Sequence, residues 1–217
     1  MADSRYNFTV SAEEYSAILL AVVVNLVVIH VGLFVYNYTV DELHWLLLQM
    51  FDLDDERNLP TWFSSFLLLN NAFFIFVYAR SVKTRQKIYW QLLAVGFFLL
   101  AMDEVAGFHD TFNTAIDMNW AIFGGILVLF VATLLVPFLL SLPKKFALRL
   151  LVAGFLYVSG AVGVELMSED MDAESVSYTL ATALEEGLEM FGALMCLYTM
   201  LIEMQKNNRV DINLSVS

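Results

Sequence analysis

The sequence predicts an all-α membrane protein with six transmembrane helices and one short amphipathic helix at the outer surface. Hydrophobic residues make up 59% of the 217 residues and charged residues only 16%, whereas about 25% of the residues in a soluble domain are charged. Six apolar segments have the length of about 17 to 25 residues that crosses a bilayer. We therefore expect residues 1–217 to form a single membrane domain, with the lipid bilayer as its main partner. The six segments lie near residues 16–37, 60–80, 88–108, 119–141, 146–167 and 178–203.

Charge is distributed unevenly over the five connections between these segments. The connection after the second segment and the one after the fourth are basic, and Lys and Arg favour cytoplasmic loops. We therefore expect both termini to lie in the cytoplasm, beneath the plasma (inner) membrane. The other connections, with the helix ends beside them, hold 18 of the 23 acidic residues and a single base, Arg57. Such an acidic outer face attracts cations and excludes nucleic acid as a partner.

The first predicted helix is apolar apart from Asn25 and His30. It is too long for the core of a signal peptide, so we expect it to be retained. An imidazole in lipid must find a partner, and His30 lies within about two turns of the outer end. It therefore either bonds a neighbouring helix or joins the acidic residues of the outer leaflet.

Residues 40–51, VDELHWLLLQMF, follow the first segment and place Leu and Met side chains at helical spacing. This pattern predicts an amphipathic helix that lies on the outer surface. The acidic turn after it lacks the glycine and the bidentate Glu of a calcium loop, so we expect a solvated turn.

Pro60 then begins the second membrane helix. That helix contains adjacent amides, Asn70 and Asn71, and at least one of them must point into the bundle. In the fifth helix, Ser159 and Gly163 predict a packing face of small residues.

The third segment ends in AMDEVAGFHDTFN, which places four ionisable residues at the mouth of a helix. Such groups cost about 3 kcal/mol at the bilayer centre on insertion scales, so they are functional candidates. An unbroken helix through residue 110 would place Asp103 and Asp110 on one face, with His109 beside them and Glu104 turned away. Gly107 could loosen this geometry.

The last segment contains LEEGLEM, and its three acidic side chains share one 100° arc of the helix. Glu165, on the fifth helix, lies at the same outer level. Because only Arg57 could pair with acids on this side, we expect a captured cation to compensate them. The predicted ligands of a divalent cation are Asp103, His109, Glu165, Glu185 and Glu189.

Carboxylates with one imidazole suit zinc, manganese or iron, whereas oxygen ligands alone suit magnesium or calcium. If the site is catalytic, the metal would activate a bound water molecule. Glu186 or Glu104 would then act as the general base on a lipid-like or small substrate. A minor alternative has His30 and His109 as axial ligands of a haem.

The stretches DLDDERNLPTWFSSFLLL, AMDEVAGFHD and LEEGLEMFG resemble a family of uncharacterised bacterial polytopic membrane proteins. The resemblance covers about a third of the chain and implies a multi-pass membrane protein without a known activity.

Two other classes of function remain open. In a proton- or cation-coupled transporter, the carboxylates would be the ion sites, and Asn70 and Asn71 would extend a polar path inward. The weakness of this reading is the absence of an ionisable residue between Glu189 and Glu203. In a non-catalytic assembly factor or subunit, the acidic face would dock a protein partner in the membrane.

Overall fold

The computed structural model describes residues 11–82, 86–109, 111 and 119–206, and within these ranges the chain is helical and contains no strand. Six helical stretches are long and apolar enough to cross a membrane, one of them the continuous stretch Lys144–Ser168. The all-helical prediction is therefore confirmed. The elements are α1 (Ala12–Thr39), α2 (Trp45–Phe51), α3 (Leu59–Ser81), α4 (Gln86–Ala106), α6 (Trp120–Leu140), α7 (Lys144–Val158), the π-helical segment η1 (Ser159–Val164), α8 (Glu165–Ser168) and α9 (Val176–Lys206).

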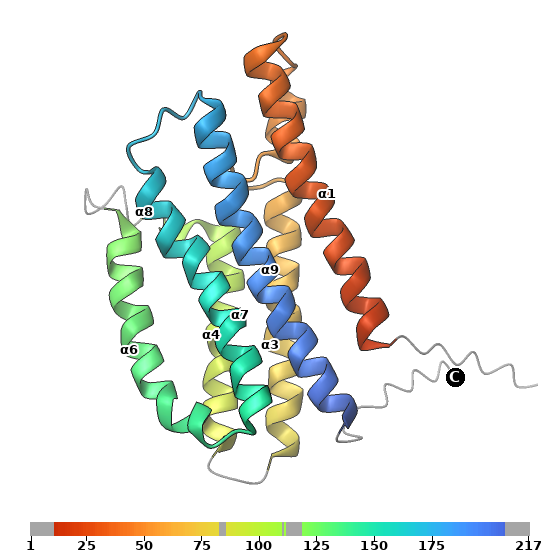
Figure 1. The fold of residues 1–217 in the computed structure, drawn as a ribbon, viewed down its shortest axis with the longest axis vertical. Coiled ribbons are helices and arrows are strands. Elements are labelled where there is room, and N and C mark those ends of the chain that lie inside the picture. Colours follow the sequence, from red (N-terminus) through yellow and green to blue (C-terminus); the bar gives the residue numbers. More distant parts are fainter. Residues whose placement is uncertain (1–10, 83–85, 110, 112–118, 207–217) are drawn as a thin grey trace, which may run out of the picture.

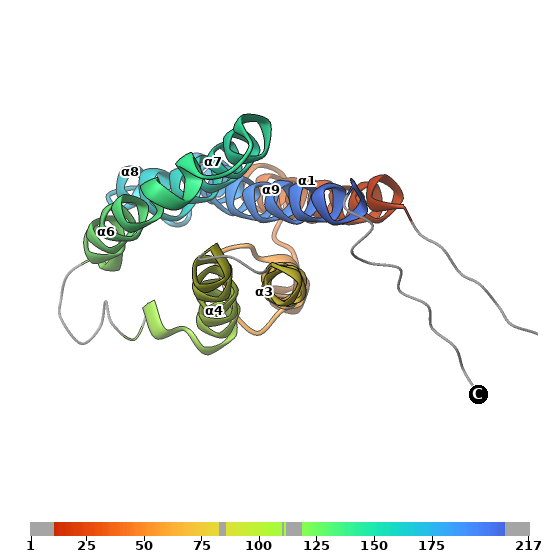
Figure 2. The ribbon, with the colours of Figure 1, turned by 90° about the horizontal axis from the view of Figure 1, so that it is seen from below.

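The long helices form two layers. Figure 2 shows α6, the α7–α8 stretch, α9 and α1 in one row, with α3 and α4 side by side in the other. Helix α9 lies in the middle of the larger layer, where it contacts α1, α7, η1 and also α3 across the interface. Any group that α9 directs toward α3 and α4 is therefore enclosed by the bundle.

Side-chain caps fix the beginnings of α1 and α3. The Ser11 hydroxyl accepts the Glu14 N–H, and the Glu14 carboxylate accepts the Ser11 N–H, which is a capping box. Asn58 caps α3, and Pro60 in the first turn of α3 needs no donor there. The observed helices begin and end within a few residues of the apolar segments that the sequence predicts.

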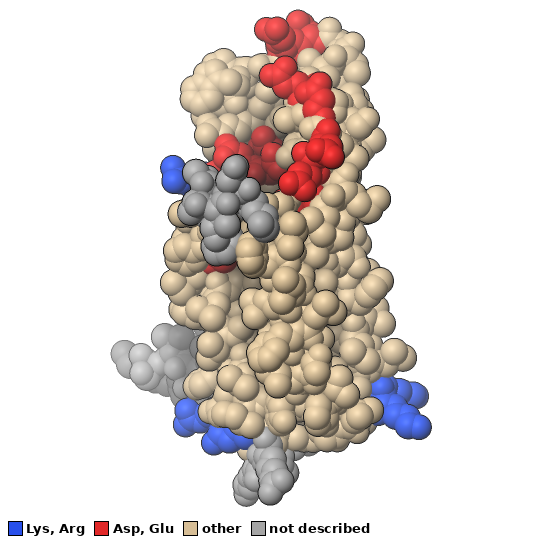
Figure 3. Space-filling view, turned by 90° about the vertical axis from the view of Figure 1, so that its left-hand side faces the viewer, with Lys and Arg blue, Asp and Glu red and all other residues tan. Residues whose placement is uncertain are grey.

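The ends of the bundle carry opposite charge. Figure 3 shows Asp and Glu side chains gathered toward the upper end, where some line a hollow, and Lys and Arg mainly at the lower end. Helix α1 begins and α9 ends toward the lower end (Figure 1). We call the two ends the acidic end and the basic end. That the basic end faces the cytoplasm stays a prediction.

Three local features differ from the prediction. Helix α2 begins at Trp45 rather than at residue 40, because the chain turns first: Asn37 Oδ1 accepts the Leu43 N–H at 2.8 Å, and His44 caps the helix. Helix α4 ends at Ala106, because Gly107 adopts a left-handed φ of 57°. The predicted packing face of Ser159 and Gly163 is wrong. Ser159 donates to its own helix, and a Cβ added at Gly163 would meet nothing within 4 Å.

Candidate functional site

Helices α4, α8 and α9 bring five carboxyl groups together toward the acidic end of the bundle. Glu165 on α8 and Glu185 on α9 lie close to each other. Two neighbouring carboxylates repel each other, so a proton or another cation bound between them would stabilise the pair. The five residues, all half-buried, are named the carboxyl cluster and are Glu104, Glu165, Glu185, Glu186 and Glu189.

Hydroxyl groups lie beside the inner part of the carboxyl cluster. Glu189 lies close to the hydroxyl of Tyr157 on α7. Glu104 lies close to Ser64 on α3 and interacts electrostatically with both Glu186 and Glu189. The prediction that Glu104 turns away from Asp103 concerned only the face of its own helix, and the acids near Glu104 in the structure include two from α9.

A π-helical segment shapes the wall next to Glu185 and Glu189. At Gly160 in η1, an added Cβ would lie 2.5 Å from the Glu185 carbonyl oxygen and 2.9 Å from Glu189 Cγ. Only a glycine lets the two backbones approach this closely. The π-helical turn is wider than an α-helical turn and lies between Tyr157 and Glu165 on this stretch. Such π-helical insertions occur frequently at functional sites.

Asn119 connects Glu165 to the helix beside it. Its amide nitrogen donates to Glu165 Oε1 at 3.2 Å, while its Oδ1 caps α6 by accepting the Ala121 N–H at 2.8 Å. The position of the Glu165 carboxyl group therefore depends on where α6 begins.

Asp103 and His109 form a separate pair at the end of α4. The left-handed Gly107 folds the chain back, so the His109 N–H donates to Asp103 Oδ1 at 3.1 Å and His109 Nδ1 lies 3.1 Å from Asp103 Oδ2. His109 interacts electrostatically with Glu104, Glu165, Glu185 and Glu189. The unbroken helix considered for this stretch does not form, and Asp110 lies outside the described residues.

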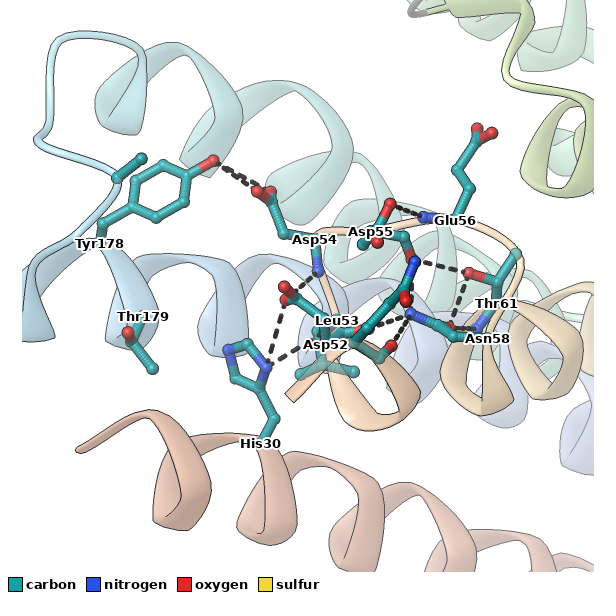
Figure 4. Close-up of polar contacts among 12 residues, drawn as sticks. His30, Asp52, Leu53, Asp54, Asp55, Glu56, Asn58, Thr61, Tyr178 and Thr179 are labelled. Carbon is teal, nitrogen blue, oxygen red and sulfur yellow. Dashed lines mark hydrogen bonds and ion pairs between the residues drawn. The ribbon is translucent and has the colours of Figure 1, made fainter. Parts of the chain in front are cut away.

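The acidic loop, residues 52–57, also reaches the site. The Tyr178 hydroxyl on α9 lies 2.9 and 3.0 Å from the two carboxylate oxygens of Asp54 (Figure 4). Asp54 interacts electrostatically with Glu165, Glu185 and Glu186. Sequence reasoning took this loop as a solvated turn only and missed its role at the site.

Glu56 reaches the same region from the acidic loop. Its carboxylate lies against Gly107, where an added Cβ would be 2.5 Å from Glu56 Oε1. The signal that could have found this contact is Gly107 itself, because a glycine at the end of an apolar run often marks a close approach of another segment.

Asn58 gives the acidic loop its shape. Its amide nitrogen donates to the carbonyl oxygens of Gln49, Asp52 and Asp55 at 3.2, 2.7 and 2.8 Å, and its Oδ1 accepts the Thr61 N–H at 3.1 Å (Figure 4). A single buried side chain thus connects α2, the loop and the first turn of α3.

His30, on α1, contacts the acidic loop and is not part of the carboxyl cluster. Its Nδ1 accepts the Leu53 N–H at 3.1 Å and lies 3.6 Å from Asp52 Oδ1, while the other side of the ring faces Thr179 (Figure 4). A ring nitrogen that accepts a hydrogen bond carries no proton. Burial, together with the charges of Asp54 and Asp55, raises the pKa of Asp52 to about 6.

The structure does not show the predicted divalent-metal site. Asp103 lies beside His109, Glu165 beside Glu185, and Glu189 beside Tyr157. Within the described ranges, no group of three or more His, Cys, Asp and Glu residues is arranged to hold a metal ion. The metal site therefore stays a prediction.

Asn71 marks the inner limit of the polar region. Its Nδ2 donates to the Leu67 carbonyl at 3.0 Å and to the Ala193 carbonyl on α9 at 2.9 Å. Its Oδ1 is buried and has no hydrogen-bond partner among the described residues. Ala193 follows Glu189 by four residues, so this amide lies about one helical turn inward of the carboxyl cluster.

Comparison with known proteins gives the family of the chain and no activity. No curated protein and no solved structure matches the chain. One family model matches residues 17–203, which include every helix of the site. The chain therefore belongs to the family described as "Domain of unknown function (DUF8692)".

Proposed function

We propose that this protein is a proton-coupled membrane transporter and that the carboxyl cluster is its proton-binding site. The observation that carries the proposal is the gathering of five carboxyl groups from three helices. None of them pairs with Lys or Arg in the part of the chain that the structure describes. Unpaired carboxylates repel one another in a medium of low dielectric constant, so bound protons or cations must compensate them.

The contacts within the carboxyl cluster favour protons over a divalent metal. The Glu165–Glu185 pair accommodates a proton between two oxygens, and Tyr157 supplies a hydroxyl that can donate to Glu189. A divalent metal would instead need several oxygens at one point, and the described residues do not provide this arrangement. A metal-dependent hydrolase is therefore less well supported than proton exchange.

Passage toward the basic end would use the interface between α3 and α9. Asn71 supplies a buried acceptor one turn inward of Glu189. The residues that follow on α9 are apolar and packed, so inward access requires the helices to rearrange. The π-helical η1 at Gly160 is a suitable place for such a change, because π turns alter the register of a helix by one residue.

Proton flux through reconstituted protein tests the proposal. Vesicles that contain the protein and an internal pH-sensitive dye should respond to an imposed pH gradient faster than empty vesicles. Glu185→Gln and Glu189→Gln should each lower this rate at least tenfold. Glu174→Gln provides the matched control, because Glu174 is an exposed acid at the same end and lies outside the carboxyl cluster.

Folding of each variant is checked by circular dichroism and by elution as a single species. Vesicles that show no flux under either a pH gradient or a membrane potential would reject transport. If the folded protein also co-purified with one stoichiometric protein partner, a role as a non-catalytic subunit of a membrane complex would replace transport as the proposed function.

A further inference from the structure

Helix α2 exposes apolar side chains that no described part of the chain covers. None of its seven residues is buried, and four large apolar side chains are exposed by 39% to 65% of their area. Leaving such surface in water costs about 25 cal/mol per Å². The four residues, named the α2 apolar surface, are Trp45, Leu46, Leu47 and Met50.

The α2 apolar surface adjoins the exposed apolar surface of two long helices. Helix α2 contacts both α1 and α3, and Asn58 fixes it to the first turn of α3 through the Gln49 carbonyl. Trp62 in that turn is 64% exposed. Both α1 and α3 are long and apolar enough to cross a membrane, so one partner can cover the three helices together.

We propose that α2 inserts the α2 apolar surface into the interfacial region of the outer leaflet. Tryptophan is enriched at this depth, where its ring contacts acyl chains and its N–H reaches water. A short helix with an exposed apolar surface is also the usual form of an interfacial anchor.

The charges beside α2 select the class of lipid. Asp41 and Glu42 precede the helix, the acidic loop follows it, and no Lys or Arg lies between residues 41 and 56. Anionic headgroups would be repelled by these carboxylates, so zwitterionic lipid fits best. A second copy of the chain would bring two acidic surfaces together, which disfavours a dimer through this surface. The proposal goes beyond the proposed transport function and does not depend on it.

Fluorescence quenching by brominated lipid tests this contact. The intact protein, Trp45→Phe and Trp62→Phe are placed in phosphatidylcholine vesicles whose acyl chains carry bromine. If Trp45 contacts lipid, its removal lowers the lipid-quenched part of the emission, as the removal of Trp62 does. Bromine near the carbonyl end of the chain should quench Trp45 more than bromine near the methyl end. Trp90, only 1% exposed, supplies unquenched emission in every sample.

Two outcomes would overturn the proposal. In the first, the emission that Trp45→Phe removes is quenched by iodide in the aqueous phase and not by brominated lipid, which would mean that Trp45 lies in water. In the second, Trp45 is shielded from both quenchers and becomes accessible on dilution of the protein in the vesicles, so a second copy covers it. Circular dichroism and an unchanged melting temperature show that each Phe variant is folded.

Discussion

The hydroxyl of Tyr178 lies within hydrogen-bonding distance of both carboxylate oxygens of Asp54 and thereby connects α9 to the acidic loop. Residues that are 124 positions apart are joined by this contact. This side-chain hydrogen bond between the acidic loop and α9 lies beside the carboxyl cluster.

Tyr178→Phe should destabilise the protein by about 1 kcal/mol, because a hydrogen bond to a charged group is lost. Asp54→Asn should have a smaller effect in the Tyr178→Phe background than in the wild type, because the two residues share one interaction. Unfolding in detergent by denaturant measures both. Tyr36→Phe is the control, as Tyr36 is an exposed tyrosine of α1; equal losses at Tyr36 and Tyr178 would contradict the prediction.

Asp52 should make stability depend on pH. Its pKa in the folded protein is raised from 3.8 to about 6, so the folded state holds this proton more tightly than the unfolded state does. The ionised carboxylate therefore costs stability above about pH 6, and this cost disappears as the pH falls toward the unfolded pKa. Asp52→Asn should stabilise the protein above the folded pKa by on the order of 2 kcal/mol.

The gain from Asp52→Asn should shrink progressively in more acidic buffer. Glu42→Gln serves as the control, because Glu42 is an exposed acid before α2 and lies outside the acidic loop. Denaturant unfolding at several pH values measures the effect, and a gain that does not vary with pH would argue against titration of Asp52.

Gly160→Ala should destabilise the protein by about 1 to 3 kcal/mol, because the new methyl group would overlap the Glu185 carbonyl. The same substitution at Gly163, three residues along the same segment, meets open space and should be tolerated. The difference between the two melting temperatures measures the effect. Similar losses at both positions would mean that helix register, and not contact with α9, limits this segment.

Divalent metal should leave the melting temperature unchanged. The described residues contain no group of three or more ligands arranged to hold an ion, so zinc, manganese or calcium would require side chains to rearrange before binding. Thermal unfolding with and without each ion, after chelator treatment, measures this. A saturable rise with one ion per chain would restore the metal site that the sequence predicts.

The helices could be predicted from the sequence because they depend on local properties. Long apolar runs bounded by polar residues set the limits of the spans, and Asn58 with Pro60 set the start of α3. The sequence also pointed to the acidic candidates, since a carboxylate inside an apolar run is unusual wherever it points, and their role stays a prediction.

The pairing of those acids could not be predicted, because it depends on two departures from regular helix. The left-handed Gly107 turns His109 back onto Asp103, and the π-helical η1 changes the direction in which Glu165 points. Neither departure is visible in a period of 3.6 residues. The roles of Tyr157 and Tyr178 were missed for a different reason: an isolated tyrosine in an apolar segment gives no signal of which helix it will contact.

The hydrogen bonds of the Asn58 amide join α2, the acidic loop and α3. These segments are therefore expected to move together as one rigid unit. The unit includes Asp54, which lies beside the carboxyl cluster. A change in the thickness or lateral pressure of the bilayer that tilted α2 would consequently move Asp54 relative to the acids of α8 and α9.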